Sequence, residues 1–256
     1  MSVSRISERL AVILVEPRHP GNIGMVCRAM ANFGVRDLRL VNPCAHLHPE
    51  AHKFAVFASE LLGEARVFAT LADALADLEV SVATTRRPGR LRAELLDLAQ
   101  IPRQLETHAL SGRIGLVFGR EDAGLTNAEV AACRYAATIA TQAHTGSLNL
   151  AQAVVVSLYE LCRAAPPATG EDVRASATEG ELAGLYAEME AVLRRIAFLN
   201  PACPEAQMNP LRDIFRRAGL TSAETGMLRG LWSQLAWSIR DWRGPRKGGG
   251  GADEPA

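Results

Sequence analysis

Polar side chains gather in two loops that each follow a predicted buried strand. The first loop, VEPRHPGNIG (15–24), leads into an apolar helical stretch that carries Arg28. Asn22 lies where a helix N-cap is expected, so its amide either caps the helix or contacts a ligand. Arg28 either faces solvent or points toward a ligand or a second subunit. The second loop, in LVFGREDAGL (116–125), places Glu121 at the carboxyl end of a strand, where open α/β sheets bind ligands; the alternative is a tight turn with a solvated carboxylate.

A third loop, within IATQAHTGSLN (139–149), opens another helix with Ser147 and Asn149. Exposed N–H groups at a helix start favour a carboxylate or phosphate, although a serine or asparagine there is more often only a cap. No G-x-G-x-x-G fingerprint of a Rossmann-type dinucleotide site occurs in the chain. The three loops therefore predict a ligand site of another kind.

Short apolar runs alternate with helical segments between residues 10 and 162, which positions these loops. Strands are predicted at 10–16, 38–41, 79–85, 113–119 and 135–140. Helices are predicted at 22–33, 50–62, 70–78, after the capping box formed by Thr126 and Glu129, and at 149–162. This alternation predicts an α/β fold with a mostly parallel sheet that helices cover on both faces.

The β pattern ends at a stretch rich in Pro and Gly (164–173), which we interpret as a linker. Helices are predicted beyond it, from the cap Thr178 to about Leu199, over 209–218, and from the cap Thr221 to about Trp242. The predicted domains are an α/β domain (1–165), a small all-helical extension (166–243) and a disordered tail (244–256).

Composition excludes several classes of protein. The 256 residues include 28 basic and 28 acidic side chains, and 48% are hydrophobic, as in an ordinary globular chain. No apolar run approaches the ~20 residues of a spanning helix, and the N-terminus lacks the apolar core of a signal peptide. The five cysteines are scattered and form no C-x-x-C pair, which indicates reduced thiols. We therefore expect a cytoplasmic protein without a membrane partner.

Basic residues cluster although the net charge is zero. One cluster, which could contact phosphates but which a solvated helix face would also explain, consists of Arg86, Arg87, Arg90 and Arg92. Three histidines, His46, His48 and His52, have a spacing that could suggest a metal. Because no carboxylate partner pattern accompanies them, we expect no metal site.

The order of the three loops is more specific than any one of them. N-x-G-x-x-x-R (22–28), F-G-x-E-x-x-G-L (118–125) and S-L-N-x-x-x-A (147–153) together resemble the three motifs of the SpoU/TrmH branch of the SPOUT RNA methyltransferases. The resemblance covers about residues 10–162. The helical extension after the third motif makes the chain most similar to members that methylate a tRNA ribose at anticodon-loop position 32.

The resemblance implies a fold that periodicity does not show, namely a C-terminal deep trefoil knot formed around 119–125, Ile139 and 146–153. S-adenosylmethionine would lie bent in this knot. By motif position its binding residues would be Thr84, Thr85, Arg86, Gly119, Ile139, Gly146, Ser147 and Leu148.

The resemblance also implies the residue roles. Arg28 would act on the ribose hydroxyl, and since a guanidinium is a poor general base, we expect it to stabilise the developing alkoxide. The residues that orient Arg28 and the ribose would be Asn22, Glu121, Ser147 and Asn149. RNA would lie along Arg87, Arg90 and Arg92, and the enzyme would be a homodimer that acts on tRNA and not on DNA.

Two alternatives stay open at this point. The same chemistry could act on another tRNA nucleotide or on rRNA, because the motifs define methyl transfer better than they define the nucleotide. A protein that binds RNA through the knot without catalysis is the non-enzyme alternative. The complete set of polar motif residues argues against it.

Overall fold

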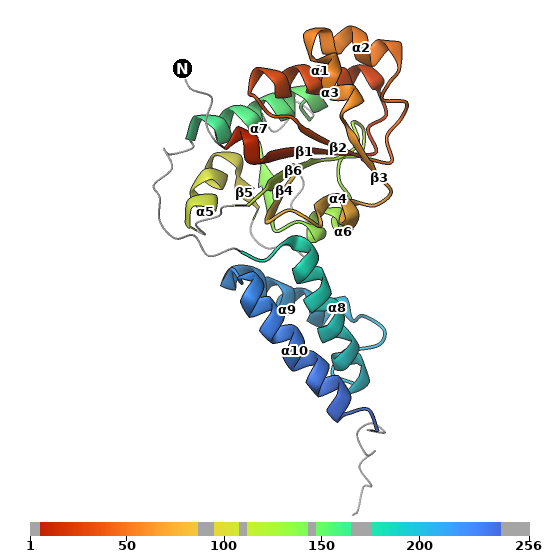
Figure 1. Ribbon diagram of the computed structural model, residues 1–256, viewed down its shortest axis with the longest axis vertical. Helices are drawn as coiled ribbons and strands as arrows, with labels where there is room; N and C mark the ends of the chain where they lie inside the picture. Colours follow the sequence, from red (N-terminus) through yellow and green to blue (C-terminus); the bar gives the residue numbers. More distant parts are fainter. Residues whose placement is uncertain (1–5, 87–94, 108–111, 143–146, 165–175, 242–256) are drawn as a thin grey trace, which may run out of the picture.

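The structure, a computed structural model, describes residues 6–86, 95–107, 112–142, 147–164 and 176–241. Its centre is a seven-stranded sheet in the order β3-β2-β1-β6-β4-β7-β5, in which every paired strand is parallel (Figure 1). The strands are β1 (Leu10–Val15), β2 (Asp37–Val41), β3 (Arg66–Phe68), β4 (Val80–Thr84), β5 (Leu96–Asp97), β6 (Ile114–Phe118) and β7 (Tyr135–Thr138). The prediction of a mostly parallel α/β sheet is confirmed.

Helices cover both faces of this sheet. The α-helices of this part are α1 (Pro20–Asn32), α2 (Pro49–Ala55), α3 (Ser59–Gly63), α4 (Leu71–Leu75), α5 (Ile101–Thr107), α6 (Asn127–Ala132) and α7 (Leu150–Ala164). Short 3-10 helices are η1 (Ser7–Arg9), η2 (Val56–Ala58) and η3 (Leu98–Gln100). Helices α1 and α7 lie on one face with α2 and α3 outside them, whereas α4 and α6 lie on the other face (Figure 1).

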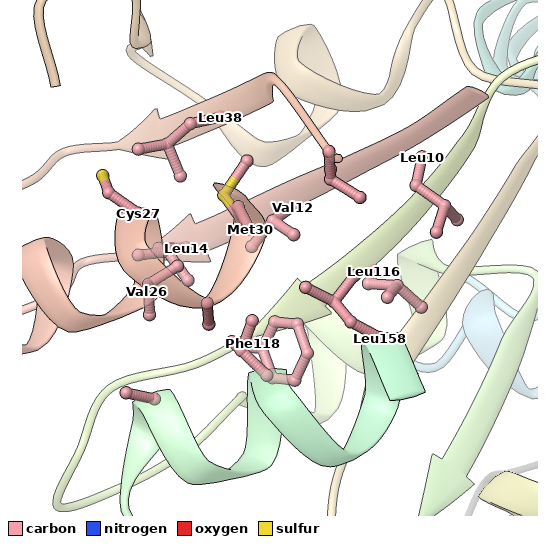
Figure 2. Close-up of a cluster of buried hydrophobic side chains, with 14 of the residues drawn as sticks. Leu10, Val12, Leu14, Val26, Cys27, Met30, Leu38, Leu116, Phe118 and Leu158 are labelled. Carbon is pink, nitrogen blue, oxygen red and sulfur yellow. The ribbon is translucent and has the colours of Figure 1, made fainter. Parts of the chain in front are cut away.

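The two-residue period of β1 builds both cores. Leu10, Val12 and Leu14 point to α1 and α7, where they pack with residues such as Met30 and Leu158 (Figure 2). The alternate residues of the same strand belong to the core under α4 and α6. Because β1 is buried on both faces, it reads as the continuous apolar run typical of a parallel sheet.

Three helices follow the sheet: α8 (Glu179–Arg195), α9 (Glu205–Ala218) and α10 (Ser222–Ser238), with a separate apolar core. They join the sheet at the start of α8, where Glu179 N donates to Leu78 O at 2.7 Å. Ser81 Oγ on β4 donates to Glu179 Oε1 at 2.7 Å, and both side chains are buried. None of the helices that the structure describes is long and apolar enough to cross a membrane.

Several predicted boundaries were wrong. The single helix at 50–62 is divided into α2, η2 and α3 because Val56 has a φ of 54°. The helix from Thr178 ends at Arg195, just before Ala197 with a φ of 58°. Helix α9 begins at Glu205 and contains Pro210, which sequence patterning reads as a helix start or break. The last helix ends at Ser238 rather than near Trp242.

Strands β3 and β5 were not predicted, because three and two residues are too short to show a period. The three capping boxes at Thr126, Thr178 and Thr221 are confirmed. The predicted linker lies almost entirely outside the described residues, as do the tail and residues 143–146, through which the predicted knot would pass.

Candidate active site

The candidate site lies at the carboxyl edge of the sheet, where β1, β4, β6 and β7 end side by side. A pocket opens here between the loops that follow these strands. It is lined by residues that include Thr84, Thr85, Arg86, Phe118, Gly119, Glu121, Leu125, Ile139, Ser147, Leu148 and Leu150. Connections leave the adjacent strands β1 and β6 toward opposite sides of the sheet, which makes a crevice at this edge.

The Glu121 carboxylate joins the loop after β6 to the start of α1. Its Oε1 accepts from Asn22 Nδ2 at 2.9 Å and from His19 N at 3.1 Å, while Oε2 accepts from Arg18 N at 3.0 Å. Burial alone would raise the pKa of Glu121, but these hydrogen bonds hold that pKa below its usual value. Glu121 is therefore a fixed anion, and its interpretation as a solvated turn residue is wrong.

Asn149 connects the third loop to the same network. Its Nδ2 donates to Asn22 Oδ1 at 3.1 Å, and its Oδ1 accepts from Ala151 N at 2.9 Å in the first turn of α7. Asn149 is thus both a cap and a member of the site. The buried Asn22 amide lies between the other two side chains and fixes the relative position of all three loops.

Asn22 does not cap α1, contrary to one interpretation of the sequence. The N-cap position is His19, and Pro20 occupies the first helical position, where a missing N–H costs nothing. Asn22 consequently lies inside the first turn. Its side chain is free of the helix backbone and bonds Glu121 and Asn149 instead.

Two glycines shape the loop that presents Glu121. Gly124 has a φ of 68°, and its N–H donates to Arg120 O at 2.8 Å, which closes a tight turn. A Cβ on Gly119 would lie 2.2 Å from the Gly124 carbonyl carbon and 2.3 Å from Leu125 N. The backbone passes too close at this point for any side chain.

Arg28 stands outside this network. It is exposed on α1, and its guanidinium forms no hydrogen bond or ion pair with another described residue. It lies six residues, or about 1.7 helical turns, after Asn22. The structure therefore leaves the guanidinium available for a substrate or a second subunit, while Asn22, Glu121 and Asn149 are brought together without it.

The residues predicted to bind the cofactor or RNA lie partly in the pocket and partly outside the described residues. Thr84, Thr85, Arg86, Gly119, Ile139, Ser147 and Leu148 all line the pocket. Gly146 lies outside the described residues, as do Arg87, Arg90 and Arg92. Ser147 is exposed and contributes no hydrogen bond to the Asn22 network among the described residues.

Sequence reasoning missed several site residues. The backbone N–H groups of Arg18 and His19 bind Glu121, and backbone donors leave no signal in residue types. Asp122 forms an exposed ion pair with Arg18 at the mouth of the site. Arg120, which pairs with Glu16 and Glu129, was also missed.

The three histidines with a metal-like spacing lie around the start of α2. His48 Nδ1 accepts from Glu50 N at 3.2 Å and caps α2. Within the described ranges, no three histidine, cysteine, aspartate or glutamate side chains gather in a way that could hold a metal ion.

Comparisons with known proteins agree with this arrangement. The SpoU rRNA Methylase family matches residues 9–159, and the C-terminal domain of the tRNA methyltransferase TrmJ matches residues 180–246. A "tRNA (cytidine/uridine/adenosine-2′-O-)-methyltransferase TrmJ" of Pseudomonas aeruginosa (strain UCBPP-PA14) is 37% identical over 244 residues, which is 89% of this chain and 93% of that protein.

Solved structures give the same result. The crystal structure of TrmJ from Z. mobilis ZM4 is 34% identical and superposes with a TM-score of 0.75, over 88% of this chain and 98% of that one. The SpoU methyltransferase AviRb from Streptomyces viridochromogenes, solved in complex with AdoMet, is 23% identical with a TM-score of 0.50, over 61% and 60% of the two chains; it supports the fold alone.

The class of protein follows from two findings. The parallel sheet carries three polar loops at its carboxyl edge, and the family match covers most of the sheet region. The chain belongs to the SpoU methylase family. Within that family, its α8–α10 region is the C-terminal domain found in TrmJ.

Proposed function

We propose that the protein transfers a methyl group from S-adenosylmethionine to the ribose 2′-hydroxyl of a cytidine or uridine in tRNA, at anticodon-loop position 32. The observation that carries this proposal is the hydrogen-bonded chain Glu121–Asn22–Asn149, which connects all three motifs beside one pocket. The TrmJ relatives, whose names specify tRNA 2′-O-methylation, extend over nearly the whole chain and include the helical region.

The pocket fits S-adenosylmethionine. Thr84 Oγ1 is buried there and has no hydrogen-bond partner among the described residues, so it can bond a polar group of the cofactor. Backbone around Gly119 approaches closely, and Phe118, Leu125 and Ile139 offer apolar surface to a purine ring. We assign cofactor binding to the predicted set Thr84, Thr85, Arg86, Gly119, Ile139, Gly146, Ser147 and Leu148.

The bound cofactor supplies an electrophilic methyl group on a sulfonium. The protein must hold the ribose hydroxyl in line with that methyl group and stabilise the charge that the oxygen gains. Arg28 supplies a permanent positive charge for this purpose, since the pKa of a guanidinium above ~12 prevents it from acting as a general base at neutral pH. Asn22, Glu121, Ser147 and Asn149 position the ribose and the loops around it.

The RNA would reach the pocket past Arg86, which is exposed at its rim. Arg87, Arg90 and Arg92 continue the chain from this point and would contact phosphates. Helices α8–α10 would contact a second part of the tRNA. We keep the division into a catalytic domain (1–165), a helical domain (166–243) and a tail (244–256), which the separate core of the helices supports. Since tRNA is its substrate, we place the protein in the cytoplasm.

A homodimer would complete the site. Val155 and Tyr159, one turn apart on α7, are 41% and 52% exposed, and α7 packs beside α1, which carries the exposed Arg28. An exposed apolar surface on α7 and an exposed arginine on the neighbouring helix fit a partner subunit that covers the former and brings substrate to the latter. Val155→Asp should give monomers in light scattering and should lose activity at concentrations where the wild type is dimeric.

Methyl transfer to unmodified RNA tests the proposed function. Purified protein and S-adenosylmethionine are incubated with transcribed tRNA or with rRNA fragments, and nucleoside mass spectrometry with nuclease mapping locates the product. We expect a 2′-O-methyl pyrimidine at position 32 of tRNA. A product only in rRNA or at another tRNA position would replace the substrate assignment, and cofactor binding without any product would favour an RNA-binding protein.

The same assay can test which bases are accepted at position 32 of the tRNA. The name of the P. aeruginosa relative includes adenosine beside cytidine and uridine. Transcripts with each of the four bases at position 32 therefore measure whether this chain accepts pyrimidines alone.

A further inference from the structure

Arg120 is the residue next to Glu121, lines the same pocket and bonds a different set of partners. Its Nε donates to Glu16 Oε2 at 2.9 Å, and its Nη2 lies 2.7 Å from Glu16 Oε1. Nη1 and Nη2 donate to the two carboxylate oxygens of Glu129 at 3.1 and 3.0 Å. Nη1 also lies 3.3 Å from Gly124 O, so every nitrogen of the guanidinium is engaged.

The two carboxylates belong to different structural elements. Glu16 directly follows β1 and has a φ of 47°, and its N–H donates to Val41 O on β2 at 2.8 Å. Glu129 lies in the first turn of α6, where it also accepts from Thr126 N at 2.7 Å in the capping box. Arg120 thus joins the ends of β1 and β6 to the start of α6. Its side chain is only 12% exposed.

The loop is therefore held by two adjacent side chains. Arg120 fastens it to β1 and α6, while Glu121, one residue on, receives the N–H groups of Arg18 and His19 and the Asn22 amide. Residues 120 and 121 are adjacent in a turn closed by the bridge between Arg120 and Gly124, so both anchors act on the same short segment. Among the side chains, only the forked guanidinium of arginine has enough N–H donors to form hydrogen bonds with two carboxylates at once.

We propose that Arg120 is a positioning residue for methyl transfer: its double ion pair with Glu16 and Glu129 fixes the 119–125 loop so that Glu121 can hold Asn22 and the pocket keeps its shape. This inference rests on the proposed function for its kinetic consequence. Its structural consequence, the order of the loop, does not depend on the substrate.

The chain offers a matched control in Arg39. This arginine is fully buried on β2 and pairs with two carboxylates, Asp37 and Asp77, as Arg120 does. Asp37 begins β2, so the Arg39 cluster is directed to the edge opposite the pocket. Each of the variants Arg39→Met and Arg120→Met removes a guanidinium that pairs with two carboxylates, but only the second lies at the site. Asp37 and Asp77 still have Arg66 and Arg113 as ion-pair partners.

The experiment measures hydrogen exchange of the cofactor-free protein and methyl transfer to tRNA, at a temperature where the variants are folded. We expect Arg120→Met to speed amide exchange at 119–125 at least 10-fold and to lower kcat/KM at least 30-fold. Arg39→Met should lower the Tm but change both quantities less than 2-fold. Arg120→Lys keeps one ion pair and should therefore be more stable than Arg120→Met. Its exchange rate and its kcat/KM should lie between those of the wild type and Arg120→Met.

A double-mutant cycle identifies the partners. Glu16→Gln and Glu129→Gln should each lower kcat/KM about 3-fold or more alone and add little to Arg120→Met. Wild-type exchange and turnover in Arg120→Met, or equal losses in Arg39→Met, would overturn the inference. A wild-type protein that is inactive on every RNA would refute the proposed function, while the exchange comparison would still decide whether Arg120 fixes the loop.

Discussion

Asn22 Nδ2 donates to Glu121 Oε1 at 2.9 Å, although 99 positions separate the two residues. This hydrogen bond connects the loop after β1 to the loop after β6. Asn149 extends the connection to α7 through the other atom of the same amide. A buried amide that must donate on one side and accept on the other fixes its own orientation and that of both neighbours.

Asn22→Asp should disable the site. The new carboxylate would face Glu121, so one of the two acids must become protonated or move. We expect kcat to fall about 10²-fold, comparable with the loss of one well-placed polar group in an enzyme site. Steady-state methyl transfer checks this. Asn42→Asp is the control, since the Asn42 amide also donates a hydrogen bond, to Ala69 O, but Asn42 is exposed and does not line the pocket; equal losses in the two variants would contradict the role of Asn22.

Acid should weaken the protein partly through Glu121. Its pKa is lowered in the folded state, so its contribution to stability is present above the ordinary value of about 4.5 and is lost as the pH falls through the folded-state pKa. Glu121→Gln removes this titration. Denaturant unfolding between pH 7 and pH 3 should therefore show a shallower acid decline in Glu121→Gln; parallel curves for the two proteins would show that Glu121 is not held as an anion.

Glu179, the buried acid where α8 meets the sheet, should have the opposite effect on the pH dependence of stability. Burial raises the pKa of Glu179, and its hydrogen bond from Ser81 and the nearby Arg216 and Arg134 only partly offset this. The stabilisation from a raised pKa is full below about pH 4.5 and is lost as the pH rises through the folded value. Glu179→Gln should thus gain stability relative to the wild type as the pH rises from 4 to 8. A constant difference in unfolding free energy across this range would argue against that.

Gly119→Ala should damage the pocket. Its Cβ would overlap backbone atoms of Gly124 and Leu125, which cannot rotate away as a side chain could. We expect a loss of about 2–3 kcal/mol in unfolding free energy and weaker cofactor binding by calorimetry. Gly63→Ala, where no atom lies within 4 Å of the added Cβ, should be neutral or stabilising by up to ~1 kcal/mol. Equal stability of the two variants would show that the loop can open.

Arg28→Ala should separate catalysis from folding. The side chain is exposed and bonds no other described residue, so the unfolding free energy should change by less than about 0.5 kcal/mol. Single-turnover methyl transfer should fall at least 10³-fold, and the cofactor Kd should stay within about 2-fold. Arg28→Lys keeps the charge and should retain part of the rate. Wild-type turnover in Arg28→Ala would remove Arg28 from the mechanism.

The sequence was sufficient for the fold class because β1, β6 and α7 are long and strongly patterned. Strands β3 and β5 could not be predicted from the sequence, since such short segments become strands only by pairing with β2 and β7. Pro210 misled the prediction of α9 because a proline inside a helix is rare, and here Glu205 already begins the helix.

The sequence predicted which residues belong to the site but not which of their atoms are in contact. Asn22, Glu121 and Asn149 were selected from their motifs, yet which atom bonds which depends on the order of strands in the sheet. Arg120 was missed because a lone arginine beside a glycine has no pattern; its meaning depends on Glu16, which is 104 positions away.

The acceptor atom is the central claim, and a single substituted nucleotide tests it most directly. A tRNA with 2′-deoxycytidine at position 32 only is compared with the same tRNA carrying cytidine, using radiolabelled S-adenosylmethionine and the wild-type protein. We predict methyl transfer to the ribonucleotide and none to the deoxynucleotide, with tRNA binding unchanged. Equal transfer to both tRNAs would contradict 2′-O-methylation at this position.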